Sequence, residues 1–474
     1  MAPSAITTDH NDIPVAKVDV HIPTGSAILH RDLHQDPSKV VRASGNYLTL
    51  SNGQVVLDAT GGAAVSCIGH GSQRVKNAIA AQLDETAYCH SLFFTSSGAE
   101  GLARVLVDST HGEMAKAFIV SSGSEAMEAA MKLARQYYLE ISPAQPQRTR
   151  FIARNESYHG TTLGALSMSG HRARRAKFEP MLLDNVSRVS ACNTYRGMRG
   201  SETVEDYVAR LSQELDDEFQ RVGPDTVCAF VAEPVVGAAL GCVPSPPGYF
   251  KAMKAICKKY GALLIMDEVM CGMGRCGTFH AWEHEGMVPD IQTIGKGLGG
   301  GYAPIAAILM NHRVLDGLDK GSGSFVHGQT YQGHPVSCAA ALEVQKIIRE
   351  ESLVENVRVM GDYLSSSLKA RIGNHPNVGD IRGRGLFWGI EFVKCKASRE
   401  PFPAAAKIAN TISTRAIDPK YSMTTYPGTG TADGYVGDHV LLAPAYNVTH
   451  DIIDKIVDTM GAVIEEVFQE ISGS

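Results

Sequence analysis

The sequence lacks the features that mark several classes of protein. Its ten cysteines contain no C-x-x-C pair, and the closest two, Cys271 and Cys276, have four residues between them. This spacing argues against zinc and thiol-redox frameworks and indicates unpaired, buried thiols in a reducing compartment. The longest apolar runs are about six residues, far short of the roughly 18 that a membrane-spanning helix needs.

Long blocks of one charge sign are also missing. The 44 lysines and arginines and the 50 aspartates and glutamates give a formal net charge of −6 and are mixed along the chain. No basic surface for nucleic acid is therefore expected. The segment from Met1 to Asp12 holds no lysine, no arginine and no apolar stretch, which fits neither a secretory signal nor a transit peptide. We predict a cytoplasmic protein that binds neither a membrane nor nucleic acid.

What is present is enough apolar material for a sizeable core. The chain has 474 residues, of which 44% are hydrophobic, and roughly 150 residues per domain gives a prior of about three domains. Glycine stands out, because the chain has 47 of them, or about 10% against about 7% in ordinary proteins.

The order of apolar runs and helical patterns predicts an α/β fold. Residues 47–50 and 54–57 flank an Asn-Gly pair and predict a hairpin. From Ser72 onward, helical patterns alternate with short apolar runs that suit strands buried on both faces. These runs are 117–120, 151–153, 228–232, 263–266 and 305–310. A mainly parallel sheet between helices is expected.

After about residue 340 the predicted strands and helices alternate less strictly. Helices are predicted over 337–350, 355–372 and from residue 449, strands over 386–393 and 440–442, and a surface loop over the glycine-rich segment 424–437. We therefore predict an N-terminal arm and hairpin over 1–70, a large domain over 71–340 and a small α+β domain over 341–474, which the hairpin joins.

The first segment with chemical character is Ser121-Ser122-Gly123-Ser124-Glu125, between a predicted strand and a predicted helix. Ser122 and Glu125 have the spacing of a capping box. The N–H groups and the dipole of a helix that starts at such a turn can hold a phosphate. An ordinary capped helix explains the same residues equally well.

The second segment is an apolar run that ends in Asp267 and Glu268. Ligands of doubly wound sheets bind outside the carboxyl ends of the strands, so an acid there can face a cofactor. A buried carboxylate needs a cation or a hydrogen-bond donor. A helix cap or a salt bridge is the structural alternative for Asp267.

The third segment places Lys296 among five glycines, at 295, 297 and 299–301. A phosphate-binding P-loop would need glycine at the position of Asp290 and Ser or Thr at that of Gly297, so that interpretation fails. Glycines permit the backbone to approach a planar ligand closely, as a Schiff-base lysine would require. A flexible surface loop with a solvated lysine is the alternative.

Histidines spaced for a shared metal also occur, at His280 and His284. Glu283 is not placed as in the H-E-x-x-H zinc motif, and we expect no metal site. Three other segments, Tyr158-His159-Gly160, Glu233-Pro234 and 327–331, are each more often structural when taken singly.

Together these segments make the sequence resemble a class III pyridoxal-phosphate aminotransferase of fold type I, similar to the omega-transaminases. The match rests on an ordered series that covers about residue 25 to the C-terminus: Ser122-Gly-Ser-Glu-Ala126, Tyr158-His-Gly160, Glu233-Pro234, Asp267-Glu-Val269, Gly274-Arg-Cys-Gly277, Lys296-Gly-Leu-Gly-Gly-Gly-Tyr302 and Thr330-Tyr-Gln-Gly-His-Pro335. Each motif alone is weak, and their order and spacing are specific.

The resemblance implies the cofactor pyridoxal 5'-phosphate (PLP) and a mainly parallel seven-stranded sheet between helices. Lys296 would form the Schiff base with the cofactor and then move a proton between the substrate Cα and C4′ of the cofactor. Asp267 would keep the pyridine nitrogen protonated. Tyr158 and Val269 would cover the two faces of the ring.

The resemblance also implies the rest of the cofactor site. Ser122, Gly123 and Ser124 would hold the phosphate at the helix start, and His159 and Glu233 would complete the site beside Asp267. Thr330 would reach the phosphate of the neighbouring subunit, which makes a homodimer necessary for activity.

The resemblance implies a ping-pong reaction that moves an amino group from a small amine or amino-acid donor to an oxo-acid or ketone acceptor. Many members of this family bind a substrate carboxylate with an arginine just before a C-terminal Ala-Pro or Pro-Pro pair. Here residues 437–444 read Gly-Asp-His-Val-Leu-Leu-Ala-Pro, and no arginine follows Arg415. The missing clamp argues against ornithine, acetylornithine and 4-aminobutyrate enzymes that prefer 2-oxoglutarate. We expect a hydrophobic or hydroxylated amine as donor and pyruvate or a similar small oxo acid as acceptor.

Two further groups bear on the substrate. Tyr88, Leu92 and Phe93 resemble the pocket segment of amine transaminases and would form an apolar wall. Arg172, Arg174 and Arg175 could replace the missing clamp, or they could be solvated surface residues.

Alternative reactions use the same cofactor constellation: a dialkylglycine-type decarboxylase, an aminomutase or a racemase. A non-catalytic binding protein of this fold would be expected to have lost Lys296 or Asp267, and both are present.

Overall fold

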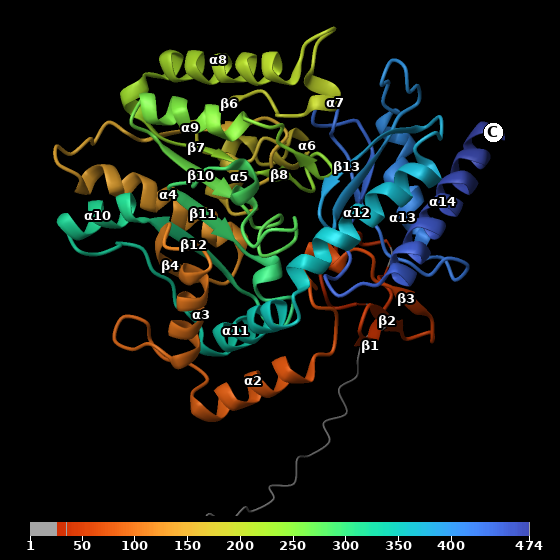
Figure 1. Cartoon of the computed structure of the whole chain (residues 1–474), viewed down its shortest axis with the longest axis horizontal. Coiled ribbons are helices and arrows are strands. Elements are labelled where there is room, and N and C mark those ends of the chain that lie inside the picture. Colours follow the sequence, from red (N-terminus) through yellow and green to blue (C-terminus); the bar gives the residue numbers. More distant parts are fainter. Residues whose placement is uncertain (1–25, 35, 474) are drawn as a thin grey trace, which may run out of the picture.

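The computed structural model describes residues 26–34 and 36–473, so most of the predicted N-terminal arm lies outside the described residues. Its central feature is a seven-stranded sheet with the strand order β4-β12-β11-β10-β7-β5-β6 (Figure 1). The strands are β4 (Met114–Val120), β5 (Arg150–Arg154), β6 (Val186–Val189), β7 (Val227–Ala232), β10 (Leu263–Asp267), β11 (Ile291–Ile294) and β12 (Ala306–Asn311).

The sheet is mainly parallel. The pairs β5/β6, β5/β7, β7/β10 and β10/β11 are parallel, and β12 alone runs antiparallel to its neighbours β11 and β4. The predicted α/β class is confirmed. The strands β6 and β11 were not predicted, because β6 is a sheet edge with polar residues and β11 carries the buried polar pair Gln292 and Thr293.

Helices cover both faces of this sheet. Ile265 of β10 packs toward α4 (Gly123–Glu140), α5 (Leu163–Met168) and α10 (His312–Lys320). Its neighbours Leu264 and Met266 pack on the opposite face toward α8 (Val204–Val222) and α9 (Tyr249–Lys259). This alternation follows the two-residue period of a strand. On that second face, α3 (Ser97–Asp108) and α11 (Pro335–Glu350) cover the β4–β12 end, with α2 (Gln73–Glu85) packed on α11.

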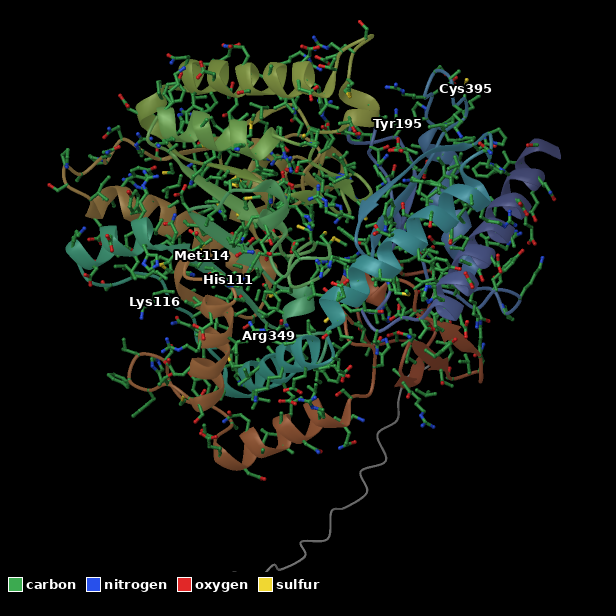
Figure 2. All side chains as sticks on the ribbon, viewed as in Figure 1. His111, Met114, Lys116, Tyr195, Arg349 and Cys395 are labelled. Atoms are coloured by element: carbon green, nitrogen blue, oxygen red, sulfur yellow. The ribbon has the colours of Figure 1, made fainter. Side chains whose placement is uncertain are left out.

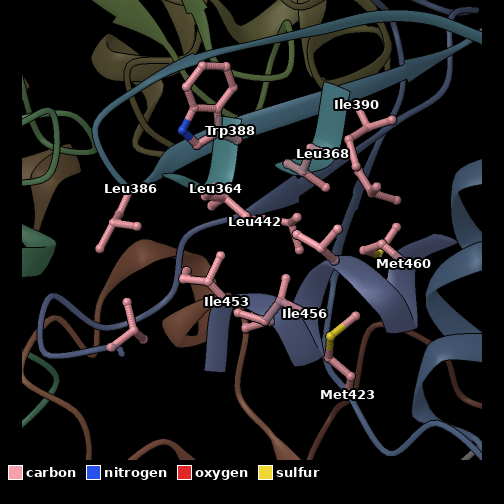
Figure 3. Close-up of a cluster of buried hydrophobic side chains, with 14 of the residues drawn as sticks. Leu364, Leu368, Leu386, Trp388, Ile390, Met423, Leu442, Ile453, Ile456 and Met460 are labelled. Atoms are coloured by element: carbon pink, nitrogen blue, oxygen red, sulfur yellow. The ribbon is translucent and has the colours of Figure 1, made fainter. Parts of the chain in front are cut away.

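The C-terminal part forms a second body, seen at the right of Figure 1. Its four-stranded antiparallel sheet has the order β13-β14-β16-β15, with strands β13 (Val378–Arg384), β14 (Phe387–Phe392), β15 (Tyr426–Gly428) and β16 (His439–Leu442). The helices α12 (Leu353–Ile372), α13 (Ile408–Ile417) and α14 (His450–Gly473) pack on it. Figure 3 shows their buried contact, a cluster that contains Leu364 of α12, Ile453 of α14 and the sheet residue Trp388.

The N-terminal hairpin joins this C-terminal body. A three-stranded antiparallel sheet contains β1 (Val40–Ser44), β2 (Tyr47–Leu50) and β3 (Val55–Leu57). The N–H of Leu57 donates to the carbonyl oxygen of Ser422 at 2.8 Å, and the N–H of Thr424 donates back to Leu57 at 2.9 Å. The predicted hairpin is confirmed. The division into domains stays a prediction.

The prediction of a surface loop over 424–437 is wrong in part. The segment contains β15, which pairs with β16, and Thr425 and Thr431 are buried. The glycines in this segment favour a loop in a sequence-based prediction, but they have structural roles here. Gly428 lies against the ring of His439, and Gly437 adopts φ +104°.

Shorter elements lie between these helices and strands along the chain. They are α1 (Gly61–Ala64), α6 (Arg172–Arg175), α7 (Thr194–Gly197), β8 (Val235–Val236), β9 (Val243–Pro244) and the 3-10 turns Glu179–Met181, Pro224–Thr226, Ala281–Glu285, Lys296–Leu298 and Ala404–Ala406. Tyr195 of α7 lies toward the C-terminal body in Figure 2, and the guanidinium of Arg399 sits 5.1 Å from the centre of its ring.

All ten cysteines are unpaired, and eight of them are buried. In the part of the chain that the structure describes, no helix is both long enough and apolar enough to cross a membrane.

Candidate active site

A cavity of about 260 Å³ lies outside the carboxyl ends of the parallel strands. Eight of the residues predicted from the sequence line it: Gly123, Ser124, Tyr158, His159, Glu233, Asp267, Val269 and Lys296. The parallel register explains this convergence, because Asp267 at the end of β10 pairs with Thr293 of β11, three residues before Lys296.

Lys296 occupies a constrained position in this cavity. It follows β11 at the start of a 3-10 turn and has φ +45°, a left-handed conformation that costs a side-chain-bearing residue free energy. Its Nζ donates to the carbonyl oxygen of Ala63 at 2.9 Å. Burial lowers the pKa of the Lys296 amine to about 8, and the guanidinium groups of Arg174 and Arg275 act in the same direction.

Asp267 is buried and held on both carboxylate oxygens. Its Oδ2 lies 2.7 Å from Nδ1 of His159, and its Oδ1 accepts hydrogen bonds from Thr293 Oγ1 and from the N–H of Val269, both at 3.0 Å. These contacts fix the orientation of a carboxylate that borders the cavity.

A buried polar chain continues behind Asp267. Burial opposes the charge of His159, but Glu233 and Asp267 outweigh it and raise its pKa. Glu233 accepts from the N–H of Tyr158 at 3.0 Å through Oε1, and its Oε2 lies 3.2 Å from Nη2 of Arg154. Negative charge beside the cavity is therefore held in place by two buried cations or donors, His159 and Arg154.

The start of α4 forms another wall. Ser122 Oγ accepts from the N–H of Glu125 at 3.3 Å, as predicted. The Glu125 carboxylate accepts from the N–H of Ser121 at 2.8 Å, one residue earlier than a capping box requires. Ser124 Oγ accepts from the N–H of Thr161 at 3.0 Å. The first N–H groups of a helix have no partner within it, so this end can bind an anion.

The glycines around the cavity lie close to other protein atoms. A Cβ on Gly123 would lie 2.7 Å from Val269 Cγ1, and one on Gly160 would lie 2.6 Å from Ser124 Oγ. In the lysine loop, a Cβ on Gly297 would lie 3.0 Å from Tyr446 Oη. These glycines therefore permit close packing of protein on protein, and the close approach of the backbone to a ligand stays a prediction.

Five predicted residues do not border this cavity in their own chain. Thr330 and Tyr88 line a separate surface depression, where the Tyr88 ring lies edge-on to Tyr331 at 6.1 Å. Leu92 and Phe93 are 73% and 74% exposed. Ser122 is the cap of α4 and lies next to the lining residue Gly123.

Several lining residues were missed or left undecided by sequence reasoning. Arg31, Ala63 and Tyr426 come from segments with no motif, and the strand pairing of Tyr426 with Leu441 is what brings it to the site. Of the three arginines at 172–175, only Arg174 lines the cavity.

The paired histidines have other partners. His280 Nε2 lies 2.8 Å from Ser109 Oγ and its Nδ1 lies 3.0 Å from Gln292 Nε2, while His284 Nε2 lies 2.9 Å from the carbonyl oxygen of Cys276. Within residues 26–34 and 36–473, no three His, Cys, Asp or Glu side chains are grouped so that they could hold a metal ion.

Comparison with known proteins places this geometry in context. Residues 29–464 match the family described as aminotransferase class-III. A protein named aminotransferase from Gibberella zeae is 57% identical over 90% of this chain and 84% of its own length. Gamma aminobutyrate transaminase 3 of Solanum lycopersicum is 35% identical over 91% of this chain and 81% of its own length. An amine transaminase from an uncultivated Pseudomonas species, solved in its PLP-bound form, has a TM-score of 0.85 and 31% identity over 95% of this chain and 99% of its own.

Proposed function

Because the chain belongs to the class III aminotransferases and is a PLP-dependent transaminase, we propose how its cavity holds PLP and which substrates it converts. The cavity's groups fit this cofactor: a largely buried amine at Lys296, an oriented carboxylate at Asp267 and a helix N-terminus at Gly123. When bound, PLP supplies an aldehyde for the amino group and a ring that takes up electrons from the substrate.

Lys296 carries the covalent link and the proton transfer in this proposal. An amine attacks a carbonyl only when it is neutral, and the lowered pKa of Lys296 provides that form near neutral pH. Once the substrate amine has displaced it, Nζ would be a base of suitable strength to take the proton from the substrate Cα and deliver it to C4′ of the cofactor. This lowered pKa in a cavity with Asp267 is the observation that carries the proposal.

The remaining residues hold and orient the cofactor in this proposal. Asp267 keeps a proton on the ring nitrogen, with His159 and Glu233 fixing its carboxylate from behind. Tyr158 and Val269 cover the two ring faces. Gly123 and Ser124 bind the phosphate with helix N–H groups, and Ser122 caps that helix.

The proposed donor is a hydrophobic or hydroxylated amine, and the acceptor is pyruvate or a similar small oxo acid. The segment 437–444 contributes β16 and no arginine, while Val235, Ala238 and Met270 give the cavity an apolar side. Since a similar protein is named a gamma aminobutyrate transaminase, 4-aminobutyrate belongs in the same donor series as a test of this proposal.

A homodimer completes the proposed site. Leu92, Phe93 and Val326 are largely exposed apolar side chains, and such a surface favours a protein partner. We place Thr330 on the phosphate of the partner subunit, with Tyr88, Leu92 and Phe93 closing the partner's cavity. A cytoplasmic location, expected from the sequence, stays a prediction.

The test compares the variant Lys296→Ala with the control variant Lys251→Ala. Lys251 is an exposed lysine of α9. Lys296→Ala is expected to lose the long-wavelength absorbance of the lysine-bound cofactor and transamination, while Lys251→Ala keeps both. Retention of that absorbance by Lys296→Ala would show that the lysine is misassigned.

A second measurement separates transamination from the alternative reactions. Adding an amino-acid donor alone to the parent protein should convert the bound cofactor into its amine form without release of CO2. Release of CO2, or racemisation of the donor with no change in the cofactor, would favour the decarboxylase or racemase instead.

A further inference from the structure

The three arginines at 172–175 have three different surroundings. Arg175 is buried and its Nη1 donates to the carbonyl oxygens of Leu166, Ser167 and Ser169, each at 2.9 Å. Arg172 is exposed, and its stem lies against Gly434. Arg174 alone borders the cavity of Lys296. The first two have structural or surface roles, so Arg174 is the member of this group that can meet a substrate.

The Arg174 guanidinium is available for a ligand. Its carbon lies 4.7 Å from the centre of the Tyr158 ring, so the side chain is held over an aromatic face. Among the residues that the structure describes, Arg174 forms no ion pair and no hydrogen bond. Its guanidinium N–H donors therefore have no partner within residues 26–34 and 36–473, and they lie in a partly buried position where a charge-assisted hydrogen bond is stronger than in water.

The charges around the cavity select where a carboxylate can bind. Asp267 and Glu233 border one side and would repel an incoming anion. Arg174 faces the same cavity closely enough that its charge contributes to the lowered pKa of Lys296. Arg31 is a second guanidinium on the lining. The C-terminal segment 437–444 contains no lysine or arginine, so a guanidinium of the lining would have to replace the water that the carboxylate of an oxo acid loses on binding.

We propose that Arg174 binds the carboxylate of the oxo-acid acceptor and thereby sets a preference for oxo acids over aldehydes. This inference rests on the proposed function and assigns one residue to it. A guanidinium can hold both carboxylate oxygens through two parallel hydrogen bonds, which a lysine cannot do. The apolar side at Val235, Ala238 and Met270 is then left for the side chain of the amine donor.

The test compares Arg174→Gln with the matched control Arg172→Gln, using two acceptors that differ only in the carboxylate, pyruvate and acetaldehyde. Losing a hydrogen bond to a charged group costs about 1.5–3 kcal/mol, or roughly 10–150-fold. The KM for pyruvate should rise by this factor in Arg174→Gln with little change in kcat, and the kinetics with acetaldehyde should stay at the parent's level. Arg174→Lys should recover part of the loss, and Arg172→Gln should match the parent protein.

Binding of a carboxylate at Arg174 can also be measured without turnover. Propionate carries the carboxylate but no carbonyl, so it should compete with pyruvate and shift the absorbance of the bound cofactor. Both effects should weaken by the same factor in Arg174→Gln. Because Arg174→Gln keeps the long-wavelength absorbance and Lys296→Ala loses it, failure of this inference is distinguishable from failure of the proposed function.

Two outcomes would overturn the inference. Equal losses with pyruvate and acetaldehyde would show that Arg174 only supports the Tyr158 ring. A selective loss for pyruvate in Arg31→Gln, with none in Arg174→Gln, would assign the carboxylate to Arg31 instead.

Discussion

At the scale of single residues, the surroundings of Lys296 decide its chemistry. Burial lowers its pKa from 10.5 to about 8. At pH 7 roughly one amine in ten is then neutral, against roughly three in ten thousand for an ordinary lysine. The motif identifies Lys296 from the sequence. Its burial, its hydrogen bond to Ala63 and the nearby charges of Arg174 and Arg275 arise only in the tertiary structure.

This pKa predicts the pH dependence of cofactor binding. The rate at which the cofactor-free protein forms its lysine link to added PLP should rise about tenfold per pH unit below pH 8 and level off above it. Stopped-flow absorbance between pH 6 and 10 measures this rate. A rate that keeps rising to pH 10 would mean that the amine has its ordinary pKa.

The adjacent carboxylates Asp267 and Glu268 predict opposite results. Asp267 borders the cavity, whereas Glu268 accepts from the N–H groups of Ala281 and Trp282 at 2.7 Å, and burial raises its pKa to about 8. At pH 7 Glu268 is mainly neutral, and glutamine in its place would keep the acceptor for one of these N–H groups and lose the other.

Asp267→Asn should therefore lower kcat by about 10²–10³-fold, the usual cost of removing one oriented electrostatic group. Glu268→Gln is the matched control, because Glu268 does not line the cavity: the lost acceptor should lower the stability, and the folded protein should keep the parent's kcat. Steady-state kinetics at pH 7 with one amine and pyruvate distinguish them. Equal losses in both variants would mean that the change acts through folding.

At the scale of elements, parallel strands bring distant residues together. The pairing of Ala232 with Met266 and of Asp267 with Thr293 puts Glu233, Asp267 and Lys296 at one edge of the sheet. Sequence patterns predicted the apolar strands well because burial on both faces leaves a simple signature. They missed β11, because its buried Thr293, which donates a hydrogen bond to Asp267, interrupts that apolar signature.

Helix α12 allows a test in which local preference and packing disagree. Alanine at Gly361 would favour the helix by about 1 kcal/mol, but its Cβ would lie 2.3 Å from the carbonyl oxygen of Gly385. Backbone cannot move aside as a side chain does, so Gly361→Ala should destabilise the protein by about 1–3 kcal/mol. Ser366→Ala, on the exposed side of the same helix, should not.

Urea unfolding followed by circular dichroism measures both variants of α12. If Gly361→Ala were as stable as Ser366→Ala, helix propensity would outweigh the contact between α12 and the β13–β14 turn, and the packing argument would be wrong.

At the scale of the whole molecule, the exposed apolar segment around Leu92 and Phe93 is the surface on which the proposed homodimer depends. Thr330 lies outside the cavity of its own chain, and the homodimer stays a proposal. If Thr330 acts across the interface, Thr330→Ala should weaken PLP binding by roughly 10–150-fold, because a hydrogen bond to a charged phosphate is lost.

Mixed subunits test this arrangement. A dimer with one Lys296→Ala and one Thr330→Ala subunit contains one intact site if Thr330 acts in its partner, and none if it acts in its own chain. Mixing the two variants under exchange conditions should therefore restore PLP affinity and activity above either variant alone. No recovery, with exchange verified by mass, would contradict the proposal.

The sequence alone determined the α/β class, the family and the eight motif residues that line the cavity, because their order and local spacing are properties of the chain itself. The tertiary structure decided the rest. It separated Arg172, Arg174 and Arg175, showed that Gly123 and Gly160 make room for protein atoms, and brought Tyr426 to the site through β15. The reason is physical: burial, close packing and charge proximity arise between segments far apart in sequence, and no local pattern encodes which of them will meet.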